Sequence, residues 1–217
     1  MEKTTLIVTD CIKFGWNAFK QRPWFFVGTV LIYAIIQFAV GMIQETMPGI
    51  LSFVISIIVS TFLYTGLVGV YLKAHDNVSA PTLKDLWNPK PFLNYLILSV
   101  LLMVIILIGL VLLIIPGIIA ALMFSFSGFL VVDKGMNPIA ALKESYRLVK
   151  GHLGKLALLG LAIFGLAVLG IIPLLLGLLV VAPVAMFATI HAYRTLSGGT
   201  LAKKEDVVPT PEPTIVA

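Results

Sequence analysis

The chain has 217 residues, of which 59% are hydrophobic and only 12% are charged. Soluble globular domains carry about a quarter charged residues, so this composition excludes an ordinary water-soluble domain and indicates an integral membrane protein. The formal net charge of +5 does not point to nucleic acid, because basic residues of a membrane protein more often set its orientation and contact anionic lipid.

Charge-free windows predict an all-α protein with about six membrane-spanning helices. The first two windows, residues 23–44 and 46–72, are each long enough for one span. Residues 91–132 also contain no charge, and one helix of that stretch would be about 63 Å long at ~1.5 Å per residue, about twice the ~30 Å hydrocarbon core. This window therefore holds two spans, and we expect the last window, residues 156–193, to divide in the same way.

Each pair of spans is expected to form a hairpin whose turn contains proline. The predicted structural turns are Pro48-Gly49, Pro116-Gly117 and Pro173. Proline lacks a backbone N–H and disfavours helix in the residue before it, while glycine adopts turn dihedrals that other residues avoid. The segment between Gly117 and Asp133 is short for a span, so a re-entrant fourth segment is the open alternative.

The distribution of basic residues predicts the orientation of the chain. All fifteen Lys and Arg residues fall before the first span, between spans two and three, between spans four and five, or after span six. Because cytoplasmic loops carry the excess of Lys and Arg, both termini should face the cytoplasm. We therefore expect a multi-pass protein of the cytoplasmic membrane.

The three basic segments share a local pattern that suggests internal repetition. An aliphatic residue, Lys, two variable residues and an aromatic recur at 12–16, 83–87 and 142–146. The predicted unit is a cytoplasmic amphipathic helix that leads into a transmembrane hairpin, over residues 5–72, 82–132 and 138–194. Residues 1–196 would then form one membrane domain. The Pro-rich, charged residues 197–217 would form a disordered cytoplasmic tail.

The amphipathic segments are expected to lie in the membrane interface, with their basic residues toward anionic headgroups. In the third segment Asn137-Pro138 is a good helix start, because Asn caps and Pro suits the first helical position. Anchoring of the chain is the simpler interpretation of these segments, and specific lipid recognition is the alternative. The candidate headgroup contacts are Lys13, Lys20, Lys84, Lys90, Lys143, Arg147 and Lys150.

Small and polar residues inside the predicted spans have two interpretations. Serines and alanines at a spacing of four let helices approach closely, and they also line transport paths. We expect helix packing, because the spans carry no ionisable group except His191 near a cytoplasmic end, and ion-coupled transport needs such groups. The candidate packing residues are Ser52, Ser56, Ser60, Ala121 and Ser125, with Gln37 and Ser99 as further polar positions.

Residues 112–156 resemble a group of poorly characterised bacterial integral membrane proteins, and are similar to the membrane domain found beside some glycerophosphodiester phosphodiesterases. The motifs that carry this resemblance are Pro116-Gly117, Val132-Asp133, Pro138, Ala141-Leu142, Ser145, Leu148 and Lys150-Gly151. The resemblance implies a polytopic helical fold more strongly than an activity. No phosphodiesterase domain follows in this sequence, so that chemistry is not carried over.

No catalytic or metal-binding motif stands out in the sequence. The three histidines are isolated along the chain, and Asp133-Lys134 is interpreted as a water boundary at a helix end. We therefore expect no catalytic site, metal or cofactor, and a non-catalytic membrane scaffold or accessory factor with membrane lipid and a protein partner or second copy as its partners. A small-molecule or lipid transporter, or another lipid-handling protein, is the alternative function.

The orientation gives a first testable prediction. Single cysteines at Thr46 and Gly198, each in a Cys11→Ser background, should be labelled by an impermeant maleimide from opposite sides of the membrane. The reason is that five spans, an odd number, separate the two positions when all six spans cross, whereas a re-entrant fourth segment would leave four. Labelling of both cysteines from the same side would refute the six-span topology.

Overall fold

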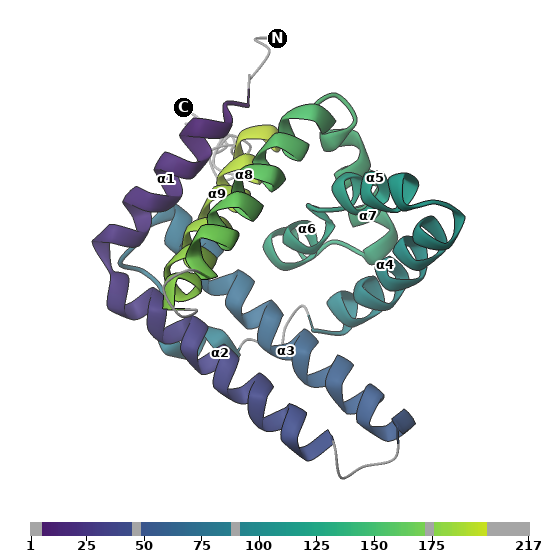
Figure 1. Cartoon of the computed structure of the whole chain (residues 1–217), viewed down its shortest axis with the longest axis horizontal. Coiled ribbons are helices and arrows are strands. Elements are labelled where there is room, and N and C mark those ends of the chain that lie inside the picture. The colour runs from purple at the N-terminus through teal and green to yellow at the C-terminus, as the bar shows by residue number, and fades with distance from the viewer. Residues whose placement is uncertain (1–5, 45–48, 88–91, 172–175, 199–217) are drawn as a thin grey trace, which may run out of the picture.

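The structure, a computed structural model, describes residues 6–44, 49–87, 92–171 and 176–198. All regular secondary structure in these ranges is helical, and Figure 1 shows how the helices are arranged. The elements are α1 (Val8–Gln21), α2 (Pro23–Gln44), α3 (Gly49–Asp76), the 3₁₀ helix η1 (Leu83–Trp87), α4 (Phe92–Leu112), α5 (Ile114–Met123), α6 (Ser127–Lys134), α7 (Pro138–Val149), α8 (Leu153–Ile171) and α9 (Leu176–Leu196).

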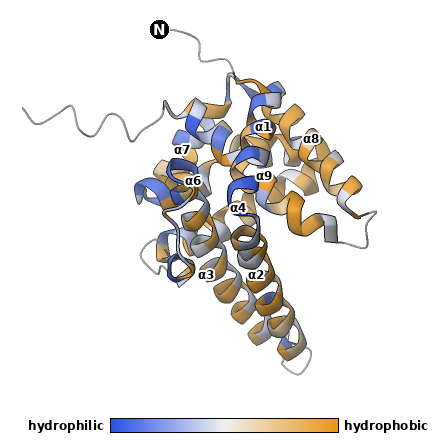
Figure 2. Ribbon diagram, turned by 90° about the vertical axis from the view of Figure 1, so that its left-hand side faces the viewer, coloured by the Kyte–Doolittle hydropathy of each residue, from blue (hydrophilic) through white to orange (hydrophobic). Residues whose placement is uncertain are grey.

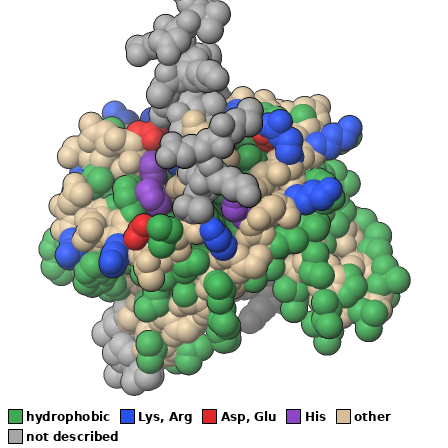
Figure 3. Space-filling view, turned by 90° about the horizontal axis from the view of Figure 1, so that it is seen from above, with side chains coloured by type: hydrophobic (Ala, Val, Ile, Leu, Met, Phe, Trp, Pro, Cys, Tyr) green, Lys and Arg blue, Asp and Glu red, His purple; other side chains and the backbone are tan. Residues whose placement is uncertain are grey.

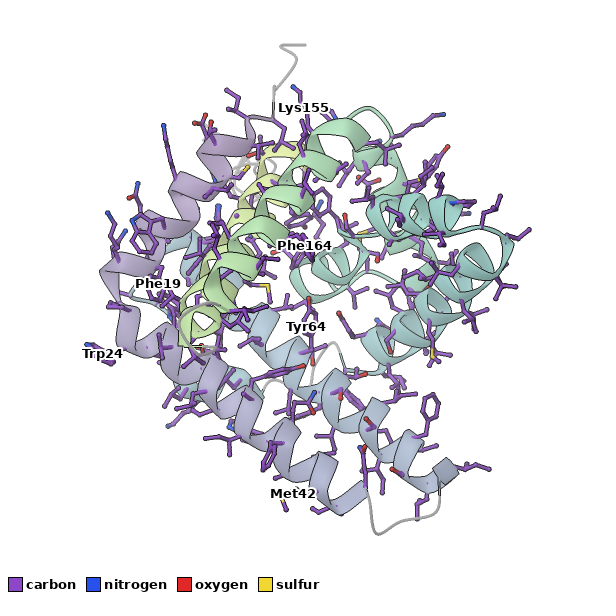
Figure 4. The ribbon with its side chains drawn as sticks, viewed as in Figure 1. Phe19, Trp24, Met42, Tyr64, Lys155 and Phe164 are labelled. Carbon is purple, nitrogen blue, oxygen red and sulfur yellow. The ribbon has the colours of Figure 1, made fainter. Side chains whose placement is uncertain are left out.

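Six helical segments of the described chain are long and apolar enough to cross a membrane, which agrees with the number predicted from the sequence. Figure 2 shows that apolar residues dominate α2, α3, α4 and α8, while α1 and α7 carry more polar ones. Many large apolar side chains are strongly exposed, Trp24 and Phe38 among them, and Figure 4 shows Trp24 pointing away from the bundle. Exposure of this kind suits a surface that faces lipid. The six segments are Pro23–Gln44, Gly49–Asp76, Phe92–Leu112, Ile114–Lys134, Leu153–Ile171 and Gly177–Leu196.

The fourth of these segments is a broken helix, made of α5 and α6. Between them the chain turns at residues 124–126, which would leave backbone groups without helical partners. The buried Ser145 of α7 supplies two bonds there: its Oγ donates to Met123 O at 2.8 Å and accepts from Phe126 N at 3.2 Å. Because unpaired backbone groups are costly where water is absent, this serine stabilises the break.

The reversal between α4 and α5 does not lie where the sequence suggested. The extended residue is Leu113, with φ −170° and ψ 149°, while Pro116 and Gly117 lie in the first turn of α5. Proline is tolerated there because the first helical N–H groups have no intrahelical acceptor. Gly117 instead lets the helices cross closely, since a Cβ on Gly109 would be 2.9 Å from Gly117 Cα. Of the other predicted turns, Gly49 begins α3, whereas Pro48 and Pro173 lie outside the described residues.

Two of the predicted packing residues do not pack within the chain. Ala121 and Ser125 are exposed, although Gly117 at the start of the same row is buried. A spacing of four puts Gly117, Ala121 and Ser125 on one side of a continuous helix. The helix ends at Met123, so Ser125 does not continue that side. These two residues therefore make no close helix contact in the single chain, and their packing role stays a prediction.

The amphipathic helix α1 packs its apolar side on α9 rather than on lipid alone. Cys11, Gly15 and Ala18 are buried, and a Cβ on Gly15 would be 2.5 Å from the backbone oxygen of Val184. Burial raises the pKa of the Cys11 thiol to about 11, with a smaller contribution from the nearby Asp10 carboxylate. The polar residues on the opposite side of α1 are exposed, and they are Asp10, Lys13, Asn17 and Lys20.

The short helix η1 packs against α3 at a glycine. A Cβ on Gly66 would be 1.8 Å from the backbone oxygen of Leu86, so only glycine fits there. Lys73 of α3 forms an ion pair with Asp85 of η1, whose carboxylate also accepts from Thr82 N at 2.8 Å. Burial alone would raise the pKa of Asp85, but the bonds from Lys73 and Thr82 and the charge of Lys73 hold it below its ordinary value.

The Gly66 contact generates a stability prediction with a control in the same helix. Gly66→Ala should lower the melting temperature in detergent, because backbone cannot move away from the new methyl group as easily as a side chain can. Gly69→Ala is the matched control, since a Cβ at Gly69 meets nothing within 4 Å. Alanine is favoured over glycine in a helix by about 0.5–1 kcal/mol, so this change should not destabilise. Equal melting temperatures for the two variants would contradict the close approach of η1.

A cluster of charged and polar side chains around the buried Arg194 joins three helix ends, and we call Asp76, Asp133, Tyr193 and Arg194 the Arg194 cluster. Arg194 Nη1 donates to Asp133 Oδ2 at 3.0 Å, and its Nη2 donates to Asp76 Oδ2 at 3.1 Å. The Tyr193 hydroxyl donates to the same Asp133 oxygen at 2.8 Å. The side chain of Arg194 is only 7% exposed. One guanidinium therefore connects the ends of α3, α6 and α9.

Removal of this guanidinium should destabilise the protein strongly. Arg194→Met leaves Asp133, whose side chain is 12% exposed, without its cation, and such losses typically cost about 3 kcal/mol or more. Lys73→Met is the control, because its ion pair with Asp85 involves a side chain that is 53% exposed and should contribute little. Thermal melting in one detergent compares the two variants. A larger loss for Lys73→Met would show that the cluster is not the stabilising contact.

Candidate functional site

Basic side chains gather on one face of the molecule. Figure 3 views this face from above and shows Lys and Arg side chains, two histidine patches and few acids, with apolar side chains along its edge. Six of the seven predicted headgroup contacts are described, and each of the six is exposed. They are Lys13, Lys20, Lys84, Lys143, Arg147 and Lys150, and Lys90 lies outside the described residues.

Helix α7 displays the densest group of these basic residues. Its start follows the predicted signal: Asn137 Oδ1 accepts from Ile139 N at 3.1 Å, and Pro138 takes the first helical position. Gly135, with φ 63°, ends α6 just before it in the left-handed conformation that suits glycine. These residues orient α7 so that one face lies on α6 and the opposite face is exposed.

The apolar side of α7 is divided between protein and surroundings. Leu142 and Val149 are buried, whereas Ile139 is 59% exposed and Tyr146 is 38% exposed. The helical spacing of these four residues puts them on one side of α7. The structure buries half of them, because Ser145 between them bonds to the break in the fourth segment and holds α7 against it.

A groove lies along the exposed part of this helix, and we call it the α7 groove. It has a volume of about 330 Å³ and is lined by Phe124, Ile139, Leu142, Lys143 and Tyr146. Four of these side chains are apolar or aromatic, and Lys143 is the single charged one. An apolar channel beside an ammonium group matches an acyl chain that ends in an anionic headgroup.

The cations around the groove differ in what they already bind. Arg147 forms an ion pair with Glu144 at 2.7 Å, and this bond raises the pKa of its guanidinium. The Lys150 ammonium lies 5.6 Å from the centre of the Tyr146 ring. Lys143 forms no ion pair with any residue in the described ranges, so its charge is not neutralised by the protein there.

Sequence reasoning missed the contacts among polar residues that are distant along the chain. Asp133 is more than a boundary marker, because it accepts from Arg194 and Tyr193 in the Arg194 cluster. His75 and His191 are not isolated, since Nε2 of the first lies 3.2 Å from Nδ1 of the second. Phe14 stacks on His191 with ring centres 4.3 Å apart. No local spacing reveals such pairs, although Asp133, Arg194, His75 and His191 all lie near the ends of their helices.

The histidine pair does not form a metal centre with other ligands that the structure describes. Within those ranges, no group of three or more His, Cys, Asp or Glu side chains is close enough to hold an ion. The third histidine, His152, is directed at Leu148 O, 3.3 Å away. The pair therefore acts chemically as a packed polar contact between α3 and α9.

The relatives that match this chain carry names that describe them as uncharacterised. The chain is 26% identical over 243 aligned residues to "Uncharacterized protein Rv2560" of Mycobacterium tuberculosis, which covers 97% of this chain and 74% of that protein. "Uncharacterized protein Mb2590" of Mycobacterium bovis gives the same identity and coverage. No solved structure matches the chain. Residues 91–215 match the family described as "Domain of unknown function (DUF7847)", and because this match covers more than half of the sequence, the chain belongs to that family.

Proposed function

We propose that this protein is a non-catalytic, multi-pass protein of the cytoplasmic membrane that binds anionic lipid at its basic face. The observation that carries the proposal is the α7 groove, in which an apolar channel runs beside the unpaired Lys143. The sequence alone favoured simple anchoring for this segment. The groove favours lipid binding instead, because anchoring needs an apolar face but no cavity beside a cation.

The orientation of the protein is part of this proposal. The basic residues of α1, η1 and α7 are exposed. Figure 3 shows Lys and Arg side chains gathered on one face, and cytoplasmic leaflets are rich in anionic lipid. With both termini cytoplasmic, Lys143 would lie at the level of lipid phosphates. The apolar part of the groove, with Ile139 and Tyr146, would lie just below them.

A scaffold or accessory role is the second candidate, and it has its own supporting observation. Ala121 on α5 and Ser125 in the turn that follows it are small residues, and both are exposed in the single chain. Small exposed residues on a membrane segment allow close contact between helices, so a second copy or another membrane protein could pack there. Purification in native lipid discs tests both roles, because it reports co-purifying proteins as well as lipids.

The lipid-binding role is tested with a double variant. Lys143→Gln with Lys150→Gln leaves the Arg147–Glu144 ion pair intact and should weaken binding of phosphatidylglycerol by about fivefold for each charge removed. Native mass spectrometry of the protein with graded phosphatidylglycerol measures the bound fraction. Phosphatidylcholine serves as the zwitterionic comparison.

The control for this experiment is Lys134→Gln, which removes an exposed charge at the end of α6 outside the groove. Phosphatidylglycerol binding should be nearly unchanged in this variant. If Lys134→Gln also weakens binding about fivefold, as expected for each charge removed in the double variant, only the overall positive charge matters and the groove is not a site. If the double variant binds phosphatidylglycerol like the parent protein, the lipid-binding role is wrong and α7 only anchors the chain in the membrane.

A further inference from the structure

Two adjoining cavities lie among α2, α3 and α4, inside the segments long and apolar enough to span a membrane. The first, of about 230 Å³, lies between α3 and α4, and the second, of about 290 Å³, also reaches α2. They share Ser60 and Thr61 of α3, so we treat them together as the hydroxyl-lined cavity. Its lining residues are Tyr33, Ser56, Ile57, Ser60, Thr61, Tyr64, Tyr95, Ser99, Val100 and Met103.

This cavity accounts for polar residues that the sequence assigned to helix packing. Ser56 and Ser60 line it from α3 and Ser99 lines it from α4, so these serines do not simply fill a helix contact. Gln37 of α2 lies beside it, because its Nε2 is 3.1 Å from Ser60 Oγ and 3.1 Å from the Tyr33 hydroxyl. Polar side chains from three helices therefore converge on one place at membrane depth.

Several hydroxyls of the cavity have no partner in the described chain. Ser99 Oγ donates to Leu96 O at 2.8 Å, and Ser60 is bonded to Gln37, so these two are satisfied. The hydroxyls of Tyr64 and Tyr95 form no hydrogen bond with any described residue, although both rings pack against the core. Figure 4 shows Tyr64 projecting from α3 toward the middle of the molecule. Two unbonded phenols that line one cavity are donors and acceptors available to a ligand.

The chemistry of the lining excludes a charged ligand group. None of the lining side chains is ionised at neutral pH, and Gln37 beside them is neutral. A phosphate or ammonium placed there would be buried without a counter-ion, which is expensive at membrane depth. A neutral group with hydroxyl or carbonyl oxygens would instead satisfy the two phenols.

The position of the opening indicates how a ligand reaches the cavity. Val100 and Met103 line its α4 side and are 47% and 49% exposed. Both belong to a helix that has almost no buried residues, so this surface faces the membrane. A molecule dissolved in the bilayer can therefore enter sideways while its apolar part stays in lipid.

From this geometry we propose that the hydroxyl-lined cavity binds the uncharged, hydroxyl-bearing end of a neutral membrane lipid, of the diacylglycerol type. The site is separate from the α7 groove, since the two share no lining residue. It goes beyond the proposed function, which concerns anionic lipid at the surface. Binding at either site is measured with a different lipid, so failure of one does not decide the other.

The experiment uses the full chain in lipid discs of phosphatidylcholine that contain a few per cent diacylglycerol with a photoreactive acyl chain. Tyr64→Phe combined with Tyr95→Phe removes only the two free hydroxyls and keeps both rings. Photolabelling by diacylglycerol should fall about tenfold, as expected for the loss of two hydrogen bonds to a ligand. The matched control, Tyr71→Phe, removes a buried hydroxyl outside the cavity and should be labelled like the parent protein.

A second variant guards against indirect effects of the tyrosine changes. Ser99→Leu fills the cavity with an apolar side chain that a lipid-facing helix tolerates, and it should also reduce labelling about tenfold. Mass spectrometry of the labelled peptides should place the adduct on α3 or α4 of the parent protein. Undiminished labelling of both variants, or an adduct confined to other helices, would overturn the proposal, and the cavity would then bind no lipid of this kind. The Lys143→Gln, Lys150→Gln variant should be labelled normally, because its site is elsewhere.

Discussion

The guanidinium of Arg194 is the point on which the arrangement of the helices depends. A membrane supplies little hydrophobic drive for helices to associate, because lipid tails are as apolar as leucine. The bundle therefore needs specific polar contacts, and Arg194 provides them by bonding to Asp133 on α6 and Asp76 on α3. Close approaches at glycine add packing where α4 meets α5 and where α8 meets α9, at Gly109 and at Gly170.

The number of spans was predictable because it follows from composition over long windows, and the six apolar segments agree with it. The position of the α4–α5 reversal was not predictable, because a proline occurs both in the turn between two helices and in the first turn of the second helix. Pro116 takes the second option, and the chain reverses at Leu113. The distinction depends on the neighbouring helix, which packs on Gly117, and the local sequence carries no record of that contact.

The exposed basic residues of the candidate site were predictable from the sequence, but the groove beside them was not. Basic residues of α7 could be placed on an exposed face from their helical spacing, and Lys143 and Lys150 are exposed. The groove beside them is lined also by Phe124, which follows α5 in the chain. No sequence pattern indicates that Phe124 lies next to α7. The same holds for the hydroxyl-lined cavity. Gln37 and Ser60 are 23 residues apart on different helices, and only the fold makes them neighbours.

The two hydrogen bonds of Ser145 have a mechanical consequence. They fasten α7, which carries the exposed lysines, to Met123 and Phe126 on either side of the gap between α5 and α6. Phe124 lies in that gap and also lines the groove. A displacement of α7 toward or away from the headgroups must therefore stretch these bonds or carry the broken segment with it. Through Ser145, a force applied to α7 at the membrane surface is therefore transmitted to the broken segment α5–α6 in the hydrocarbon interior.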